Sequence, residues 1–269
     1  MLDVTASIVA YNNPPELINQ AISSFLNTEL QVRLFISDNS ETETLRESLL
    51  QDDRITYIFN NANLGFGKGH NVVINGSDLD SKYHIILNPD VAFEDAELLT
   101  NMMAYADENT DIGALMPKVV YPDGETQLLA KLLPSPGDLI SRRFLPFLSN
   151  KDFDLQFTGY DQLMDVPFLS GCFMFVRTEL LQQLGGFDER FFMYCEDIDL
   201  SRRINQQART VFYPNVQITH HYAKDSYKSN AQLKIHISSA VKYFNKWGWI
   251  MDRERTEVNK KTLLKLRRA

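Results

Sequence analysis

Residues 83–90, YHIILNPD, decide how the first half of the chain is read. The first five residues form a short apolar run, which predicts a buried strand. The run stops at once at Asn88, Pro89 and Asp90, which are turn-forming residues. A buried strand that ends on an acid raises the question of whether Asp90 only makes the turn or also binds something.

Strand and helix patterns alternate on both sides of this stretch, which predicts an α/β fold with a mostly parallel, doubly wound sheet. The expected strands are 5–11, 32–36, 55–59, 83–87, 173–176 and 211–213. The expected helices are 17–25, 44–50, 71–77, 94–106, 179–184, 198–204 and 233–247, followed by a basic helix or tail. Residues 117–165 contain five prolines and are interpreted as a linker region with a flexible loop around 130–160.

Length and composition limit the function. The chain has 269 residues, enough for one large domain or two small ones. No apolar run is long enough to predict a membrane span, and the N-terminus lacks the basic region of a secretory signal. Two cysteines predict buried thiols in a reducing cytoplasm rather than a disulfide framework.

Charge is divided unevenly along the chain. Residues 224–269 hold 12 Lys and Arg against 4 Asp and Glu, whereas the preceding 223 residues hold 15 against 31. The acidic body argues against nucleic acid as a partner. The basic segment, with its interleaved aromatics, suits an anionic membrane surface, although a solvated helix face, a dimer contact or a core stripe remain alternatives.

Four polar clusters follow predicted strands, at 10–12, 37–40, 60–71 and 88–90. Each alone is explained by turn formation. Together they would lie at the carboxyl edge of one sheet, where α/β folds bind ligands. The stretch 63–71, NLGFGKGHN, is neither a P-loop nor a dinucleotide fingerprint, but its glycines would let the backbone approach a ligand closely.

The second half adds two further features. In residues 196–199, EDID, helical geometry places Glu196 and Asp199 on one face and Asp197 on another, and Asp199 is expected to form a surface pair with Arg203. A histidine pair at 220–221 follows the last predicted strand. Together with Asp90, the pair suggests a metal site completed from two distant segments.

These motifs resemble those of family 2 glycosyltransferases of the GT-A fold, close to bacterial rhamnosyltransferases of O-antigen (lipopolysaccharide) or capsule synthesis. The resemblance runs from Ser7 to about Ser226. It is carried by SIVAYN (7–12), SDNS (37–40), NLGFGKGHN (63–71), LNPD (87–90), SGCFMFVR (170–177), GGFDERFFMYCEDIDLSRRI (185–204) and HHYAKDS (220–226).

The resemblance implies roles for individual residues. Asp197 would be the catalytic base, while Asp90 and His221 would bind Mg²⁺ or Mn²⁺. Asn88 stands where many relatives have a further acid, which implies weaker metal binding. Donor and nucleotide contacts, with Asp38 at the base, would come from Ala10, Tyr11, Asn12, Asp38, Asn63, Gly65, Phe66, Gly67, Asn71 and Asn88. Acceptor contacts would come from Gly171, Tyr194 and Glu196.

The implied activity is inverting sugar transfer to a polyprenyl-diphosphate-linked saccharide, with dTDP-L-rhamnose as the favoured donor. Residues 1–223 would form the transferase domain, divided into a nucleotide-sugar half (1–110) and an acceptor half (111–223), and 224–269 a basic helical extension. The protein would be cytoplasmic and peripheral at the inner membrane face, with a homodimer left open. Alternatives are another donor (UDP-glucose, UDP-galactose or UDP-N-acetylglucosamine) and a non-catalytic nucleotide-sugar-binding module, which Asn88 favours.

Overall fold

The computed structural model describes residues 1–139, 152–221 and 230–268. Its strands are β1 (Leu2–Ala10), β2 (Val32–Asp38), β3 (Ile55–Phe59), β4 (Ser81–Leu87), β5 (Val91–Ala92), β6 (Ile112–Val120), β7 (Ala130–Lys131), β8 (Met164–Asp165), β9 (Phe168–Leu169), β10 (Phe173–Arg177) and β11 (Arg209–His220). Its helices are α1 (Pro15–Leu26), α2 (Phe66–Ile74), α3 (Leu98–Glu108), α5 (Thr178–Gln183), α6 (Glu196–Asn205), α7 (Asn230–Trp247) and α8 (Arg253–Leu266), with short 3₁₀ helices at Glu43–Ser48 and Gln156–Thr158.

One mixed sheet organises the molecule, with strand order β3-β2-β1-β4-β10-β6-β11-β5 and β8 added beside β11. The first four strands in this order are parallel, as the alternating pattern predicts. Antiparallel β10 separates them from β6 and β11, which are parallel to each other. The second half of the chain therefore extends the sheet of the first half, while β7 and β9 pair in a separate two-stranded sheet.

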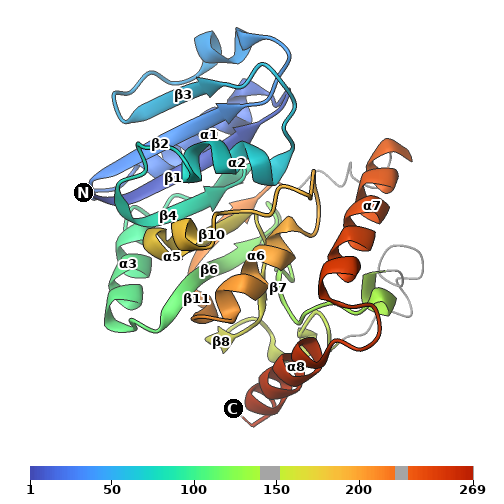
Figure 1. Cartoon of the computed structure of the whole chain (residues 1–269). Coiled ribbons are helices and arrows are strands. Elements are labelled where there is room, and N and C mark those ends of the chain that lie inside the picture. The colour runs from blue at the N-terminus through green and yellow to red at the C-terminus, as the bar shows by residue number, and fades with distance from the viewer. Residues whose placement is uncertain (140–151, 222–229, 269) are drawn as a thin grey trace.

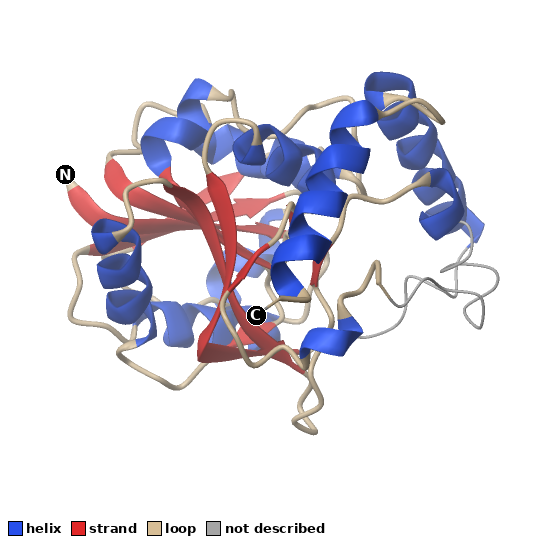
Figure 2. Cartoon of the chain, turned by 90° about the horizontal axis from the view of Figure 1, so that it is seen from below, coloured by secondary structure: helices blue, strands red, loops and turns tan. Residues whose placement is uncertain are grey.

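Helices cover both faces of the sheet (Figures 1 and 2). The side chains of α1 and α3 pack into one core with alternate residues of the strands, for example Ile22 and Met102 against Ile8. The side chains of α2, α5 and α6 pack into a second core on the other face with the intervening strand residues. This alternation is the period-two rule for a strand buried on both faces.

Several expected elements differ in the structure. The segment expected as helix 44–50 is a 3₁₀ helix, and α2 begins at Phe66, within the glycine-rich stretch. The linker interpretation is wrong for residues 117–120, because β6 runs through Pro117 to Val120 inside the sheet. The pairing with β11 shifts register after Tyr213, so that the sheet accommodates the proline residues. Of the loop expected around 130–160, residues 140–151 lie outside the described residues.

The last two helices are held to α6, and α8 also joins the core cluster that contains Phe212 of β11. The guanidinium of Arg202 on α6 is buried, and it donates two 2.7 Å hydrogen bonds to Asp252 before α8 and two more to Glu254. Trp247 of α7 stacks on the same guanidinium. In Figure 1, α7 and α8 accordingly stand beside α6 at one flank of the sheet.

Candidate active site

The polar clusters that follow β1, β2, β3 and β4 lie at one edge of the sheet, as predicted. Strand register pairs Ala10 with Asp38, Asp38 with Phe59, and Ile8 with Leu87, so the four strands end close to one another. Residues 10–12, 37–40, 60–71 and 88–90 therefore share this edge, where a ligand can bind beyond the strand ends.

Asp38 lies at the floor of the first part of this edge. It is fully buried, and its carboxylate accepts hydrogen bonds from the Tyr57 hydroxyl and from the Ser40 main chain. Burial and the Asp38 charge raise the pKa of Tyr57 well above its usual value, so the phenol stays a donor. A hollow of about 330 Å³ opens beside Ser40, lined by Asn12, Asn13, Pro15, Ser40, Thr44, Leu45 and Ser48.

We expected the glycines of the 63–71 stretch to let the backbone approach a ligand. In the structure, they let it approach other segments of the protein itself. A Cβ on Gly65 would lie 2.1 Å from the Phe192 carbonyl oxygen, and the Phe66 N–H donates to that same oxygen. A Cβ on Gly67 would lie 2.9 Å from Phe187. The stretch is therefore pressed onto the segment before α6.

Asn71 and His70 fix α2 to neighbouring segments through hydrogen bonds. The Asn71 amide bonds the Phe187 main chain at both ends, so it fixes the helix to the second half and is not turned toward a ligand. His70 bonds the Ser7 hydroxyl, which also bonds His84. Burial lowers the pKa of both imidazoles, to about 3 for His84, so they remain neutral hydrogen-bonding groups.

Asp90 faces the imidazole of His220, on the last strand. The His220 Nε2 lies 3.3 Å from Asp90 Oδ1 and 3.4 Å from the Asn88 amide nitrogen. We expected His221 here, but it meets Asp90 through its main-chain N–H, which donates to the Asp90 carbonyl.

Gln127 determines which nitrogen of His220 carries the proton. Its Nε2 donates to the His220 and Val120 carbonyls, so its Oε1 accepts from His220 Nδ1 at 2.9 Å. A neutral imidazole with hydrogen on Nδ1 has a lone pair on Nε2, which faces Asp90 Oδ1. That carboxylate oxygen is buried without a hydrogen bond among the described residues. Two electron pairs facing each other fit a cation between them.

The second acid of the site, Asp197, lies in the first turn of α6. Its carboxylate accepts hydrogen bonds from the main-chain N–H groups of Gly171 and Ile198. Burial raises its pKa, while these donors oppose the increase. Its side chain is half-buried, so it remains reachable from the site.

Glu196 differs from its neighbour. It is buried, and its Oε2 has no hydrogen-bond partner among the described residues. Burial and the charge of Asp197 raise the pKa of Glu196. Because only Asp197 has N–H donors for both oxygens, the pair carries its first negative charge on Asp197.

Asp199, the third acid, is structural. It does bond Arg203 as expected, but the pair is not at the surface, because Asp199 is fully buried. Its other oxygen accepts from Trp247 and pairs with Lys246, both on α7. Asp199 therefore fixes α6 to α7.

A two-residue bridge connects the two acids of the site. The Cys172 carbonyl accepts from the Asn88 N–H, two residues before Asp90, while the neighbouring Gly171 N–H donates to Asp197. A Cβ at Gly171 would lie 3.2 Å from the Asp197 Cβ and from the Phe66 ring. Burial, and to a smaller extent the charges of Asp90 and Asp197, raises the pKa of Cys172 to about 12. The two distant segments therefore meet in one site.

The chain enters α6 in a strained conformation. Tyr194 and Cys195 have φ values of 69° and 66°, a left-handed region that non-glycine residues rarely adopt. Such strain persists only where the surroundings enforce it, and it is frequent at active sites. Here the Met193 carbonyl accepts from Ser239, and the Tyr194 ring contacts His236, both on α7.

The remaining predicted residues are distributed around this edge. Ala10 and Gly65 are buried as backbone elements, whereas Tyr11, Asn12 and Asn63 are exposed. Sequence reasoning missed His220 as the ring beside Asp90, and it missed Gln127, which lies in the region interpreted as a linker. Only the doubled histidine carried a signal for the first of these, and no motif marked the second.

Comparison with known proteins identifies the family of the chain. The family model "Glycosyl transferase family 2" matches residues 5–185, more than half of the chain. An N-acetylglucosaminyl-diphospho-decaprenol L-rhamnosyltransferase of Mycobacterium tuberculosis is 30% identical over 242 residues, which cover 83% of this chain and 78% of that protein. Rhamnosyltransferase WbbL of Escherichia coli K12 is 22% identical, covering 88% of this chain and 90% of that protein.

Among solved structures, the mannosyltransferase PcManGT of Pyrobaculum calidifontis, in complex with GDP-Man and Mn²⁺, superposes with a TM-score of 0.59. The sequence identity is 15%, and the match covers 100% of this chain and 76% of that chain. At this identity the likeness shows the fold alone, and it agrees with the expected GT-A architecture. From its motifs, its fold and the match to the family model, the chain belongs to glycosyl transferase family 2.

Proposed function

We propose that this glycosyltransferase moves L-rhamnose from dTDP-L-rhamnose to a polyprenyl-diphosphate-linked saccharide, with inversion at the anomeric carbon. The observation that carries the proposal is the bridge at Gly171 and Cys172, which brings Asp90 and Asp197 to one site. The donor identity is supported by the 30% identical L-rhamnosyltransferase, whose name also specifies a diphospho-decaprenol acceptor. O-antigen synthesis is supported by the WbbL relative.

In the proposed reaction, an acceptor hydroxyl oxygen attacks the anomeric carbon of the donor. The bond from that carbon to the diphosphate oxygen breaks, and its electron pair leaves with the nucleoside diphosphate. Asp197 takes the hydroxyl proton; a positioned general base contributes about 10²- to 10⁴-fold. Glu196 holds its proton more strongly, which leaves Asp197 as the charged member of the pair.

A divalent metal fits the Asp90 side of the site. The buried, unbonded Asp90 Oδ1 and the Nε2 lone pair of His220 are suitable ligands for Mg²⁺ or Mn²⁺, with His221 as a further candidate. No cluster of three or more His, Cys, Asp or Glu side chains that would suit a metal is found in the described part of the chain, so phosphate oxygens of the donor would complete the coordination. A bound metal would neutralise the charge of the leaving diphosphate.

The nucleotide is proposed to lie along the strand ends. The hollow beside Ser40 would take the base, with Asp38, which bonds the Ser40 main chain, as the proposed acceptor for a ring N–H. The neutral network of Asn60, Asn39 and Ser37 holds the floor of this region. No helix among the described residues is long and apolar enough to span a bilayer. We place the protein in the cytoplasm, at the inner face of the membrane, where a lipid-linked acceptor would be available.

Asp197→Asn tests the base assignment. We expect transfer to fall by at least about 10²-fold with dTDP-rhamnose affinity within a few-fold of wild type, because only proton transfer is lost. Asp199→Asn is a poor control because Asp199 fixes α6 to α7. Glu196→Gln is the matched control, because it keeps the shape of the acid pair and leaves Asp197 in place. Retained activity in Asp197→Asn would move the base elsewhere.

Ligand binding and turnover together separate the alternatives. A panel of nucleotide sugars, tested for thermal stabilisation with and without Mn²⁺, identifies the donor. Stabilisation by a UDP-sugar rather than dTDP-rhamnose would assign another sugar. Donor binding without turnover on any lipid-linked acceptor would support the non-catalytic binding module.

A further inference from the structure

An exposed apolar tip lies where α7 turns into α8. The side chains of Ile250 and Met251 are 87% and 90% exposed, and the adjacent Trp249 is 44% exposed. Gly248, with a φ of +106°, allows the chain to turn at this point. Neighbouring large apolar side chains in water are unfavourable unless they have a partner.

The tip is held firmly although it is exposed. The Asp252 carboxylate, immediately after Met251, is buried, bonds Arg202 of α6 twice and caps α8 through the Arg255 N–H. On the other side, the Trp249 ring packs on Phe244, and its N–H donates to an asparagine of α7. The exposure of Ile250 and Met251 is therefore built into the turn and is not a property of a loose end.

The apolar surface continues along α7. Ile237 and Val241 are exposed on the outer side of the helix, and Asn245, one turn further, bonds Trp249. The spacing of four residues places these side chains in one stripe that leads to the tip. The inner side of α7 carries Tyr243 and Phe244, which are buried.

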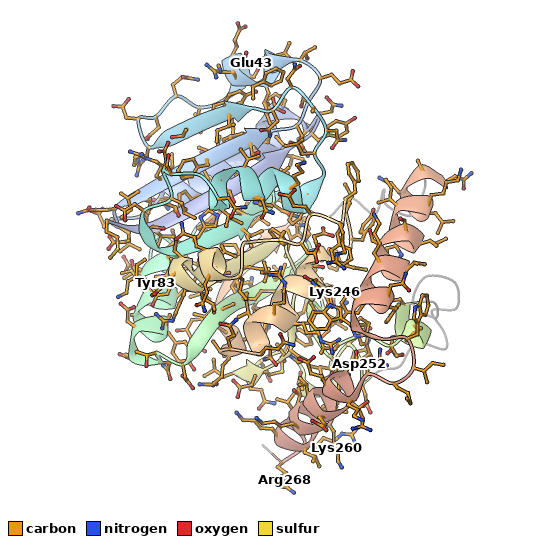
Figure 3. The ribbon with its side chains drawn as sticks, viewed as in Figure 1. Glu43, Tyr83, Lys246, Asp252, Lys260 and Arg268 are labelled. Atoms are coloured by element: carbon orange, nitrogen blue, oxygen red, sulfur yellow. The ribbon has the colours of Figure 1, made fainter. Side chains whose placement is uncertain are left out.

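A basic face adjoins the tip on α8. Arg253, Lys260 and Lys261 of α8 and Arg268 just after it are exposed at helical spacing, with one exposed acid, Glu257, on the same face. None of the four basic side chains has an ion pair within the described ranges. Lys265 and Arg267, by contrast, pair with acids of the body. In Figure 3, Lys260 and Arg268 lie at the end of the molecule opposite Glu43.

We propose that the tip (Trp249, Ile250 and Met251) and the basic face of α8 dock onto an anionic lipid bilayer. The tip would enter the boundary between headgroups and acyl chains, where tryptophan and aliphatic side chains are favoured, and the lysines and arginines would meet lipid phosphates. This inference rests on the proposed function in one respect: the protein would need to bind the membrane because its proposed acceptor is attached to a lipid.

Charge favours a bilayer over a second copy of the chain. Residues 224–269 hold 12 basic and 4 acidic side chains, and the preceding 223 residues hold 15 and 31, so only this segment is attracted to anionic lipid. A twofold-symmetric pair with α8 against α8 would bring the basic face against itself. The bilayer would also repel the acidic body, which would orient the molecule with α8 toward the lipid.

The test measures flotation with phosphatidylglycerol–phosphatidylethanolamine vesicles, without donor or acceptor. We expect the Ile250→Ser, Met251→Ser double variant to bind the vesicles more weakly than wild type by about tenfold or more, because both inserted side chains are lost. Lys260→Gln with Lys261→Gln should weaken binding by about 30-fold at low salt. Leu50→Ser is the matched control, because Leu50 is also exposed (44%) but follows the 3₁₀ helix that begins at Glu43, far from α8.

A blue shift of tryptophan emission on vesicle addition, absent with phosphatidylcholine vesicles, would place Trp249 in the bilayer. Point variants are needed because deleting α8 would leave Arg202 buried without its counter-ions. Wild-type protein that stays unbound, equal binding by the serine variant, or a change of that variant from dimer to monomer in sedimentation would overturn the proposal. Transfer to an acceptor kept in detergent should be the same in the serine variant as in wild type. If the wild-type protein itself transfers no sugar, the proposed function is refuted instead.

Discussion

Gln127→Leu is the most informative test of the site, because Gln127 is not expected to touch either substrate. The substitution removes the oxygen that accepts from His220 Nδ1 at 2.9 Å. Without that acceptor, the hydrogen can move to Nε2, the nitrogen that faces Asp90 at 3.3 Å. A protonated Nε2 has no lone pair for a metal, so we expect metal affinity to fall while Asp90 and His220 are both still present.

The magnitude follows from one hydrogen bond. When a metal withdraws charge from the imidazole, the Nδ1–H bond is charge-assisted and worth about 1.5–3 kcal/mol, which corresponds to about 10- to 100-fold in affinity. Leucine also leaves the buried carbonyl of His220 without its 2.8 Å donor, at a cost of about 1–3 kcal/mol in the free energy of unfolding. The two effects are separable, since one is read from Mn²⁺ binding and the other from thermal unfolding.

The assay is titration of Mn²⁺ in the presence of a nucleoside diphosphate, followed by the electron paramagnetic resonance signal of the free ion. Gln127→Glu is the control, because a carboxylate still accepts from Nδ1 and should keep Mn²⁺ affinity within a few-fold or improve it. A folded Gln127→Leu protein that binds Mn²⁺ within twofold of wild type would refute this reasoning. So would a larger loss in His221→Ala than in His220→Ala, which would return the ligand role to His221.

Three further outcomes are expected. Glu196→Gln should raise the melting temperature at pH 8 but not at pH 4: a carboxyl whose pKa is raised on folding contributes stability that is lost as pH rises from its unfolded value of about 4.3 to its folded value. A pH-independent difference would show that burial does not penalise this charge. Gly65→Ala should weaken nucleotide binding by about tenfold or more, because its Cβ would collide with the Phe192 carbonyl. Gly185→Ala has a similar positive φ but open space, so it should cost only stability, and equal nucleotide affinity in both variants would contradict the packing argument. Asp252→Asn should lower the free energy of unfolding by about 3 kcal/mol, measured by urea denaturation, because it leaves a buried guanidinium with one remaining carboxylate; a loss below about 1 kcal/mol would contradict the buried-pair account.

The sequence predicted the strands of residues 1–110 well because local patterns determine them. Strands buried on both faces read as continuous apolar runs, and each is followed by its own turn residues, as at Leu87 and Asn88. The acids of the site were predictable for the same reason, since Asp90 and Asp197 stand in motifs of consecutive residues. The roles assigned to them remain predictions.

The parts that were missed depend on contacts between distant residues. β6 contains Pro117, which normally argues against an inner strand, and only the register shift in β11 accommodates it. The choice between His220 and His221 depends on which way the last strand faces, and a one-residue slip in that register would exchange them. Gln127 acts through a bond across 93 positions, for which no local pattern exists.

Asn88 and Asp197 bond two residues that are adjacent in the chain, Cys172 and Gly171, and this has a consequence for engineering. Because Cys172 and Gly171 are covalent neighbours, bond lengths limit the spacing between the segments that hold Asn88 and Asp197, and loop motion changes it little. Substitutions in the surrounding walls can therefore alter which sugar fits without disturbing that spacing. A single-residue insertion at this peptide would displace one half relative to the other, so chimeras between related enzymes should keep residues 170–172 and both of their partners from the same parent.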